Sequence, residues 1–304
     1  MEKEIIYPRP LRKGDQICLI DPANARTPQA VQKVEDYLKE KGFRVTVAEE
    51  MAFKRGTWKE RAERLNRAIR DERNRALFCI WGGYGTMTLL DRLDYEAFRR
   101  NRPVFVGFSD ITALHAALGQ RSRVVTFHGP AAFGRKRLMH RETLEYMLSL
   151  AMEPEQERKI CNLDGTEFRM LTTCSQTGCR EGRLAGGNLT LVSRLMGTPY
   201  EIDTRGKILF LEEIGEKPYR LHGMLMQLRL AGKLSQAAGI LVGALRGCDN
   251  EGSPGSAMEA VEDVLGDLQV PVLTNIQAGH IEDTLTLPMN AKIRIEGNQI
   301  YQTI

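Results

Sequence analysis

The chain has 304 residues, of which 42% are hydrophobic and 27% charged, with a formal net charge of +4 at pH 7. This composition is typical of a soluble globular protein, and the length suits two domains. No window approaches the ~18 apolar residues of a membrane span. The first residues lack the apolar core of a signal peptide, so we expect a cytoplasmic protein with no membrane partner. The basic stretches lack the interleaved aromatic residues of a nucleic-acid groove, so we expect no nucleic-acid partner.

The cysteines and histidines do not form a metal-binding pattern. Cys18 and Cys79 lie within apolar strand segments and are interpreted as small core residues. The closest pair, Cys174 and Cys179, lacks further Cys or His residues at zinc-site spacing. We therefore predict no metal and no other cofactor.

Strand and helix signals alternate through the first half of the chain. The predicted strands lie within residues 16–23, 43–49, 76–85, 103–109 and 124–130, and the predicted helices within 28–42, 58–72, 86–94 and 110–120. This alternation predicts a parallel sheet covered by helices on both faces.

The alternation stops in a polar stretch and then resumes. Within the polar stretch, residues 167–171 are a candidate strand. A strand, a glycine turn and a helix are expected within residues 182–199. Further strands are expected within 207–216 and 237–247, a strand or loop within 271–280, helices within 218–234 and 257–268, and a closing hairpin within 285–304. We predict an α/β domain at residues 1–155, a linker region at 156–180 and a smaller α/β domain at 181–304.

Ser109 stands where a predicted strand meets a predicted helix, in "VGFSDI". A serine in that place resembles the nucleophile elbow of hydrolases, which exposes the hydroxyl and aims backbone N–H groups at a carbonyl. The usual G-x-S-x-G pattern is half met, because Gly107 is present and Ile111 replaces the second glycine. From this segment alone, Ser109 or Asp110 as a simple helix cap is the favoured interpretation.

A glycine-rich loop, "WGGYGT", follows another predicted strand. Glycines there allow positive φ angles and let backbone amides face an anion. The third glycine of a dinucleotide fingerprint is absent, so an oxyanion hole or a plain turn is favoured over a cofactor cradle.

Acid and base candidates occur at strand ends in the second half. Glu212 and Glu213 end an apolar strand, and His280 follows another. A serine needs a base to take its proton, and the base needs a carboxylate to fix its tautomer. Each residue alone also has a structural interpretation, as a solvated pair or a structural histidine.

Two other histidines are rival bases. His115 lies six residues after Ser109, on a largely different helical face. His128 follows a strand but has no acid partner in its own segment.

Together these segments resemble the LD-carboxypeptidases, also called muramoyltetrapeptide carboxypeptidases, whose relatives include the microcin C self-immunity peptidase. The resemblance spans nearly the whole chain. It rests on "LRKGDQICLIDPAN", "WGGYGTMTLLDRLD", "FVGFSDITALH", "TFHGP", "GRLAGGNLTLVSRLMGTPYEID", "ILFLEEIGEKPYR" and "PVLTNIQAGHIEDTLTLPMNAKI".

The resemblance implies a metal-free Ser109–Glu212–His280 triad, with the backbone amides of Gly83 and Asp110 as the oxyanion hole. It also implies a flavodoxin- or Rossmann-like N-terminal domain, a smaller C-terminal α/β domain, an active site at their interface and a homodimer. The implied reaction releases the terminal D-alanine of a murein tetrapeptide in cell-wall recycling. Hydrolysis of a peptidyl or aminoacyl nucleotide amide and a non-catalytic ligand-binding protein are the alternatives.

The chain departs from the family pattern at three places. Trp81 replaces an arginine before the glycine loop, "PYRLHG" puts His222 and Gly223 in place of Asp-Arg, and Asn290 replaces a glycine in the L-P-x-G turn. Asn tolerates a left-handed backbone better than most residues. Arginine grips carboxylates bidentately, and neither Trp nor Gly does so. We therefore expect an altered substrate preference.

The residues of the substrate pocket are predicted from their positions in the motifs. Trp81, Tyr84 and Glu213 are its candidate residues, and its occupant is a murein peptide or another small peptide-like substrate.

Overall fold

The computed structural model divides into two compact units. One unit comprises Met1–Glu155 and Thr286–Asn290, and the other comprises Gln156–Leu285 and Ala291–Ile304. The structure describes residues 4–23, 28–48, 56–130, 140–172, 179–249 and 255–304. Along these residues no helix is both long and apolar enough to cross a membrane.

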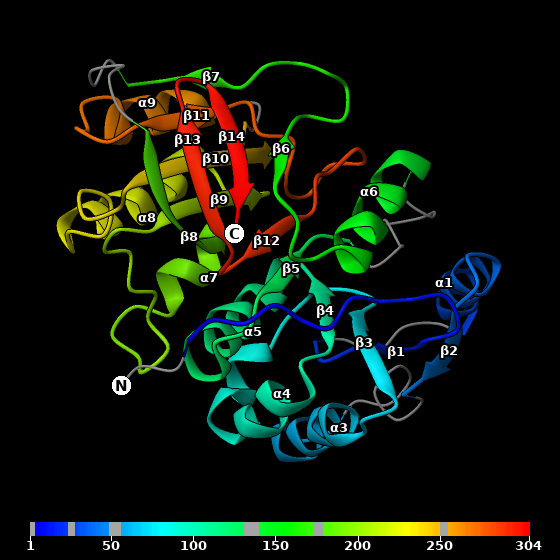
Figure 1. Cartoon of the computed structure of the whole chain (residues 1–304). Coiled ribbons are helices and arrows are strands. Elements are labelled where there is room, and N and C mark those ends of the chain that lie inside the picture. Colours follow the sequence, from blue (N-terminus) through cyan, green and yellow to red (C-terminus); the bar gives the residue numbers. More distant parts are fainter. Residues whose placement is uncertain (1–3, 24–27, 49–55, 131–139, 173–178, 250–254) are drawn as a thin grey trace. The chain divides into compact units, whose positions relative to one another are not determined.

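The first unit is built on a sheet with the strand order β12-β5-β4-β3-β1-β2 (Figure 1). Its strands are β1 (Gln16–Ile20), β2 (Arg44–Val47), β3 (Asn74–Cys79), β4 (Val104–Gly107), β5 (Thr126–His128) and β12 (Leu287–Met289). The first five are parallel, and β12 pairs antiparallel with β5. The order 2-1-3-4-5 is that of flavodoxin-like folds, which confirms the predicted fold class.

The helices of this unit cover both faces of the sheet. They are α1 (Pro28–Glu40), α3 (Trp58–Arg70), α4 (Tyr95–Asn101), α5 (Thr112–Ala117) and α6 (Arg141–Met152). Crossovers between parallel strands are right-handed, and the chain moves one way from β1 to β2 and the other way from β2 to β5. This handedness places α1 on one face and α3–α5 on the other. Helix α3 begins with a capping box between Thr57 and Glu60.

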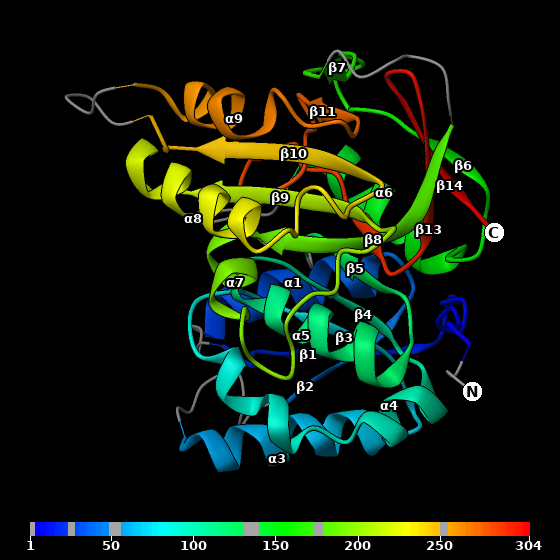
Figure 2. The ribbon, with the colours of Figure 1, turned by 90° about the vertical axis from the view of Figure 1, so that its left-hand side faces the viewer.

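The second unit has a mixed sheet with the order β6-β14-β13-β8-β9-β10-β11-β7. Its strands are β6 (Arg158–Ile160), β7 (Arg169–Met170), β8 (Arg180–Asn188), β9 (Ile208–Ile214), β10 (Gly239–Arg246), β11 (Val272–Thr274), β13 (Lys292–Glu296) and β14 (Gln299–Thr303). Strands β8 to β11 are parallel and follow one another in chain order. Their connecting helices α7 (Leu189–Arg194), α8 (Pro218–Leu230) and α9 (Ala257–Leu265) therefore share one face, as Figure 2 shows.

Two sequence expectations differ from the structure. The expected linker, 156–180, contributes β6 and β7 to the two edges of the second sheet, although residues 173–178 lie outside the described residues. The expected closing hairpin is β13–β14 alone, because β12, from the same segment, joins the first sheet. Pairings of two or three residues between distant segments leave little periodic signal in the sequence.

The first unit buries a polar side chain in its apolar core. His115, on α5, is 2% exposed, and its Nε2 lies 2.8 Å from the Gly107 carbonyl oxygen. Its Nδ1 lies 2.8 Å from the Thr126 hydroxyl. A carbonyl only accepts, so Nε2 carries the proton and Nδ1 accepts from Thr126. Burial lowers the pKa of His115 to about 4, so the ring is neutral at pH 7.

The cysteines of β1 and β3 are core residues, as predicted. Cys18 and Cys79 are 6% and 2% exposed, and burial raises the pKa of both thiols. Both therefore stay protonated and inert at neutral pH. Cys174, of the cysteine pair considered above, lies outside the described residues.

The buried neutral imidazole predicts a loss of stability in acid. Between pH ~6.5 and about 4 the unfolded chain binds a proton at His115 that the folded chain does not, so stability falls as the pH falls through this window. The contribution of this one residue is about 3 kcal/mol. Urea denaturation of wild type and His115→Gln should give a stability difference that shrinks as the pH falls from 7.5 to 4.5.

Ser149→Ala, on α6, is the control for this measurement, because it removes a hydroxyl that bonds to the Tyr146 carbonyl oxygen and no titratable group. Its stability difference from the wild type should not vary with pH across the same range. A constant difference for His115→Gln across the same range would contradict the prediction.

Candidate active site

Ser109 lies at the turn that joins β4 to the helical segment behind it. It begins a short 3-10 helix, η2 (Ser109–Ile111), which runs directly into α5. Its φ of 65° lies in the left-handed region, at a cost of order 1–3 kcal/mol for a non-glycine residue. The turn follows the carboxyl end of a parallel strand, where α/β sheets carry their sites. The local backbone is therefore that of a nucleophile elbow.

The helix-cap interpretation of this segment is wrong. Neither η2 nor α5 has a side-chain hydrogen bond at its N-terminus. Asp110 instead reaches the glycine loop, where its Oδ2 accepts from the Thr86 backbone N–H at 2.8 Å. The Thr86 hydroxyl donates to the Asp110 carbonyl oxygen at 2.5 Å. These two bonds tie the serine turn to the glycine loop.

Two glycines permit the close packing around Ser109. A Cβ on Gly82 would lie 2.5 Å from the Cβ of Ser109 and 2.9 Å from its Oγ. A Cβ on Gly107 would lie 2.8 Å from Ile111 Cγ2 and 2.9 Å from Cys79 Cβ. Gly107 is thus required because Ile111 packs directly on it, which explains the half-met G-x-S-x-G pattern.

The glycine loop carries three of the predicted site residues. Gly83 has a φ of 134°, a backbone conformation that L side chains rarely adopt. Trp81 is half-buried, and Tyr84 is 73% exposed. The structure therefore brings Trp81, Gly83 and Tyr84 into the loop beside Ser109, while their roles stay predictions.

The sequence reasoning missed Arg61, on α3. Its guanidinium donates to the carbonyl oxygen of Pro22, and its Nη1 would lie 2.9 Å from a Cβ on Gly85. Burial lowers the pKa of Arg61, while Asp110 and Asp21 favour its charged form. Arg61 therefore braces the glycine loop against the loop after β1. The sequence did contain a signal for this residue, because Arg61 lies next to the apolar stripe of the predicted amphipathic helix at residues 58–72.

The two rival histidines lie inside the first unit. His115 uses both ring nitrogens for Gly107 and Thr126, so it holds the end of β4 and is no base for Ser109. His128 is 1% exposed and meets the Phe108 ring edge-on, with centroids 6.3 Å apart. Neither ring is open to a substrate.

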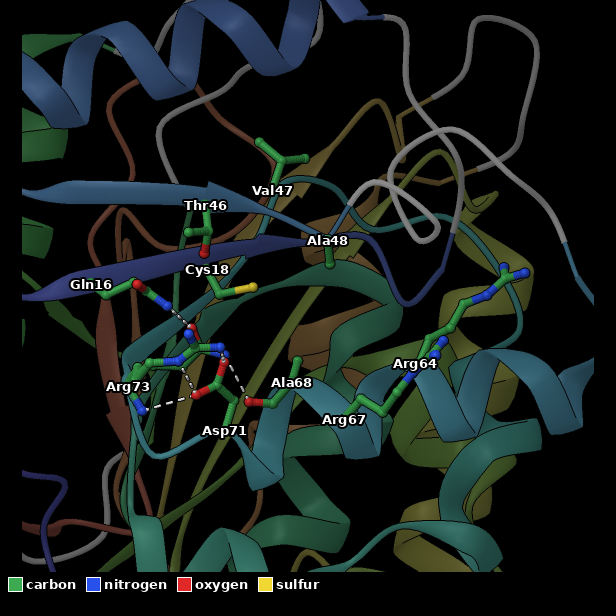
Figure 3. Close-up of a pocket in the computed structure, with 11 residues that line it drawn as sticks. Gln16, Cys18, Thr46, Val47, Ala48, Arg64, Arg67, Ala68, Asp71 and Arg73 are labelled. Carbon is green, nitrogen blue, oxygen red and sulfur yellow. Dashed lines mark hydrogen bonds and ion pairs between the residues drawn. The ribbon is translucent and has the colours of Figure 1, made fainter.

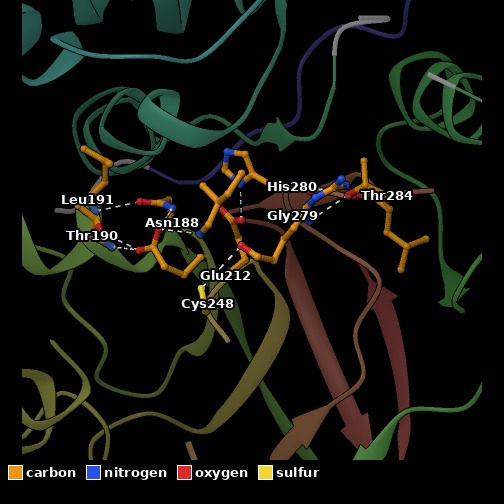
Figure 4. A network of polar contacts seen from close by, with 12 residues as sticks. Asn188, Thr190, Leu191, Glu212, Cys248, Gly279, His280 and Thr284 are labelled. Atoms are coloured by element: carbon orange, nitrogen blue, oxygen red, sulfur yellow. Dashed lines mark hydrogen bonds and ion pairs between the residues drawn. The ribbon is translucent and has the colours of Figure 1, made fainter. Parts of the chain in front are cut away.

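Glu212 and His280 form a hydrogen-bonded pair in the second unit (Figure 4). Glu212 is 0% exposed on β9, and its Oε2 lies 2.7 Å from Nδ1 of His280. A carboxylate only accepts, so Nδ1 carries the proton and Nε2 is the ring nitrogen able to act as a base. Gly279 has a φ of 126°, and a Cβ there would lie 2.7 Å from Glu212 Oε2. The segment between β11 and β12 that carries His280, residues 275–286, is called the histidine loop below. Its approach to Glu212 requires this glycine.

Glu213 points to the opposite face of β9, toward the start of α7. Its oxygens accept from the Asn188 amide at 3.0 Å, the Thr190 backbone N–H at 2.8 Å and the Thr190 hydroxyl at 2.7 Å. The Ile214 backbone N–H donates to it at 2.8 Å. A carboxylate that is 2% exposed and bonded at both oxygens fits this structural role better than the expected role in a substrate pocket.

The departures from the family pattern have separate surroundings. His222 Nε2 lies 2.9 Å from Asp263 Oδ2, which joins α8 to α9. Gly223 is exposed, with open space where a side chain would lie. Asn290 has a φ of 71°, so it adopts the left-handed backbone expected from its place in the turn.

A cavity elsewhere in the first unit is distinct from these residues. It has a volume of about 450 Å³ and lies between β1, β2 and α3 (Figure 3). Arg73 binds Asp71 at its wall, and Gln16 donates to Asn74 at 2.8 Å. None of the predicted site residues lines it.

Comparisons with known proteins cover both units. Residues 17–129 match the family model described as the LD-carboxypeptidase N-terminal domain, and residues 181–295 match that of the C-terminal domain. A probable murein peptide carboxypeptidase of Bacillus subtilis is 35% identical, over 94% of this chain and 90% of the relative.

Two solved structures extend the likeness. The muramoyltetrapeptide carboxypeptidase from Oxalobacter formigenes is 27% identical, with a TM-score of 0.78 over 94% of this chain and 97% of that one. The microcin C7 self-immunity protein MccF, in complex with aspartyl sulfamoyl adenosine, is 25% identical, with a TM-score of 0.84 over 97% of each chain. These matches confirm the resemblance inferred from the motifs, and the chain belongs to the LD-carboxypeptidase family of peptidases.

Proposed function

We propose that Ser109, His280 and Glu212 act as the catalytic triad of a serine carboxypeptidase. The observation that carries the proposal is the buried Glu212–His280 pair at 2.7 Å, which fixes the proton on Nδ1 and leaves Nε2 as the base. The left-handed backbone of Ser109, with its φ of 65° at the turn after β4, supports the role of this residue as the nucleophile.

The reaction then proceeds through an acyl-enzyme. Nε2 of His280 takes the hydroxyl proton as Oγ of Ser109 attacks the scissile carbonyl carbon. The C–N bond breaks as His280 returns the proton to the leaving amine, which leaves an ester on Ser109. A water molecule that His280 deprotonates cleaves this ester and restores the hydroxyl.

The backbone N–H groups of Gly83 and Asp110 are proposed to hold the oxyanion. Each such donor lowers the barrier by about 2.7–4 kcal/mol in comparable sites. The two bonds between Asp110 and Thr86 support this assignment, because they hold the glycine loop and the elbow in a fixed relation.

The proposed substrate is a murein tetrapeptide that loses its terminal D-alanine. The printed names of the Bacillus and Oxalobacter relatives support this substrate class. The MccF likeness and Trp81, an aromatic face on which a base can stack, support an aminoacyl nucleotide amide as the second candidate. The homodimer and the cytoplasmic location stay predictions.

Removing the nucleophile tests the triad. Ser109→Ala should lower cleavage of a murein tetrapeptide by about 10⁴-fold or more, and His280→Ala should have a similar effect. Mass spectrometry would follow the loss of one alanine. Ser149→Ala, at a serine on α6, should retain wild-type activity. Full activity of Ser109→Ala on every peptide that the wild type cleaves would refute the triad.

Gly82→Ala tests the geometry of the elbow. A Cβ 2.5 Å from that of Ser109 must displace the serine, and a displacement of about 1 Å costs roughly 10²-fold in kcat. Gly119→Ala is the matched control, because a Cβ there meets Asn290 at an ordinary 3.6 Å. Equal kcat values for the two variants would show that the packing of Gly82 does not position Ser109.

A further inference from the structure

We propose that Arg246 binds the terminal carboxylate of the substrate. This inference rests on the proposed function, and it names the group by which the enzyme would distinguish a peptide acid from a peptide amide. The family pattern has arginines at two positions where this chain has Trp81 and Gly223, so in this chain a different cation would bind the carboxylate.

The chemistry limits where such a cation lies. A carboxypeptidase releases an amino acid whose nitrogen and carboxylate are attached to the same carbon. His280 must reach that nitrogen to protonate it, so the carboxylate lies within a few ångströms of the histidine. The cation that receives it must therefore reach the rim of the histidine loop.

Arg246 meets this requirement within the second unit. It is the last residue of β10, and it pairs in the sheet with Ile214, two residues after Glu212. Its Nη1 lies 3.4 Å from the carbonyl oxygen of His280. The guanidinium thus lies beside the backbone of the catalytic histidine.

A separate backbone contact fixes β10 and the histidine loop to each other. The Ala244 backbone N–H donates to the Ala278 carbonyl oxygen at 2.9 Å, where the β9–β10 register shifts. A Cβ on Gly243 would lie 2.5 Å from that oxygen. Gly243 therefore allows the loop to approach β10, which holds Arg246 and His280 in a fixed relation.

The guanidinium has donors available for a ligand. Arg246 is exposed, and within the described ranges its long bond to His280 is accompanied by no ion pair. An arginine has five N–H donors in a planar fork, which matches a carboxylate bidentately. The matched anion is the free carboxylate at the end of a peptide.

The test compares a murein tetrapeptide ending in D-alanine with the same peptide ending in D-alanine amide. Arg246→Gln should lower kcat/KM for the acid roughly 10- to 100-fold, the usual effect of losing a hydrogen bond to a charged group. It should leave kcat/KM for the amide unchanged. Arg246→Lys should recover part of the loss, because it restores the charge without the fork.

Two control variants separate this role from a general charge effect. Lys217→Gln and Arg220→Gln remove exposed cations at the start of α8 and should leave the acid-to-amide ratio unchanged. Equal losses on acid and amide for Arg246→Gln, or no loss on the acid, would overturn the inference.

Binding to the Ser109→Ala protein separates the inference from the proposed function. Calorimetry should show that Arg246→Gln in this background weakens binding of the acid and spares that of the amide. If the wild type cleaves neither peptide but this difference appears, the carboxylate site stands and the hydrolase assignment fails. If the difference is absent, the carboxylate site fails.

Discussion

The proposed chemistry depends on one buried carboxylate and its single partner. Glu212 is fully buried, and its Oε2 accepts from His280, while its Oε1 has no hydrogen-bond partner among the described residues. A buried charge with so few partners is costly. In the proposed mechanism His280 carries a positive charge after it takes the serine proton, and the 2.7 Å contact places that charge beside the Glu212 carboxylate.

The adjacent Glu213 shows how burial assigns different roles to like residues. Successive side chains of a strand point to opposite faces, so these two carboxylates meet different surroundings. Glu213 accepts four hydrogen bonds from Asn188, Thr190 and Ile214, and it holds the start of α7. A carboxylate satisfied in this way has little lone-pair capacity for a histidine. The two faces of β9 thus give Glu213 and Glu212 different numbers of hydrogen-bond donors, and only Glu212 keeps an oxygen for the proposed catalytic histidine.

Sequence patterns predicted the parts of the structure that repeat or follow a motif. The alternation of strands and helices predicted the parallel sheet. Ser109 lies two residues after β4, Glu212 lies near the end of β9, and His280 lies in the loop after β11. The patterns did not predict features that depend on pairing between short segments far apart in the sequence. The edge strand β6 and the returning strand β12 have three residues each, whereas β7 (Arg169–Met170) lies within the candidate strand at 167–171. Arg61 was missed for a related reason, because only tertiary packing directs its side chain into the glycine loop.

The topology of the second unit explains how the proposed carboxylate-binding group can be placed without altering the proposed catalytic pair. Strands β8 to β11 are parallel, so their carboxyl ends meet at one edge of the sheet. Asn188, Glu212 and Arg246 lie at or near the ends of three neighbouring strands, and His280 follows the fourth. Backbone pairing fixes the spacing of these positions whatever side chains they carry. A cation at the end of β10 therefore reaches the loop that carries His280 while the contacts of Glu212 on β9 stay unchanged, which separates the proposed carboxylate recognition from the proposed cleavage of the bond.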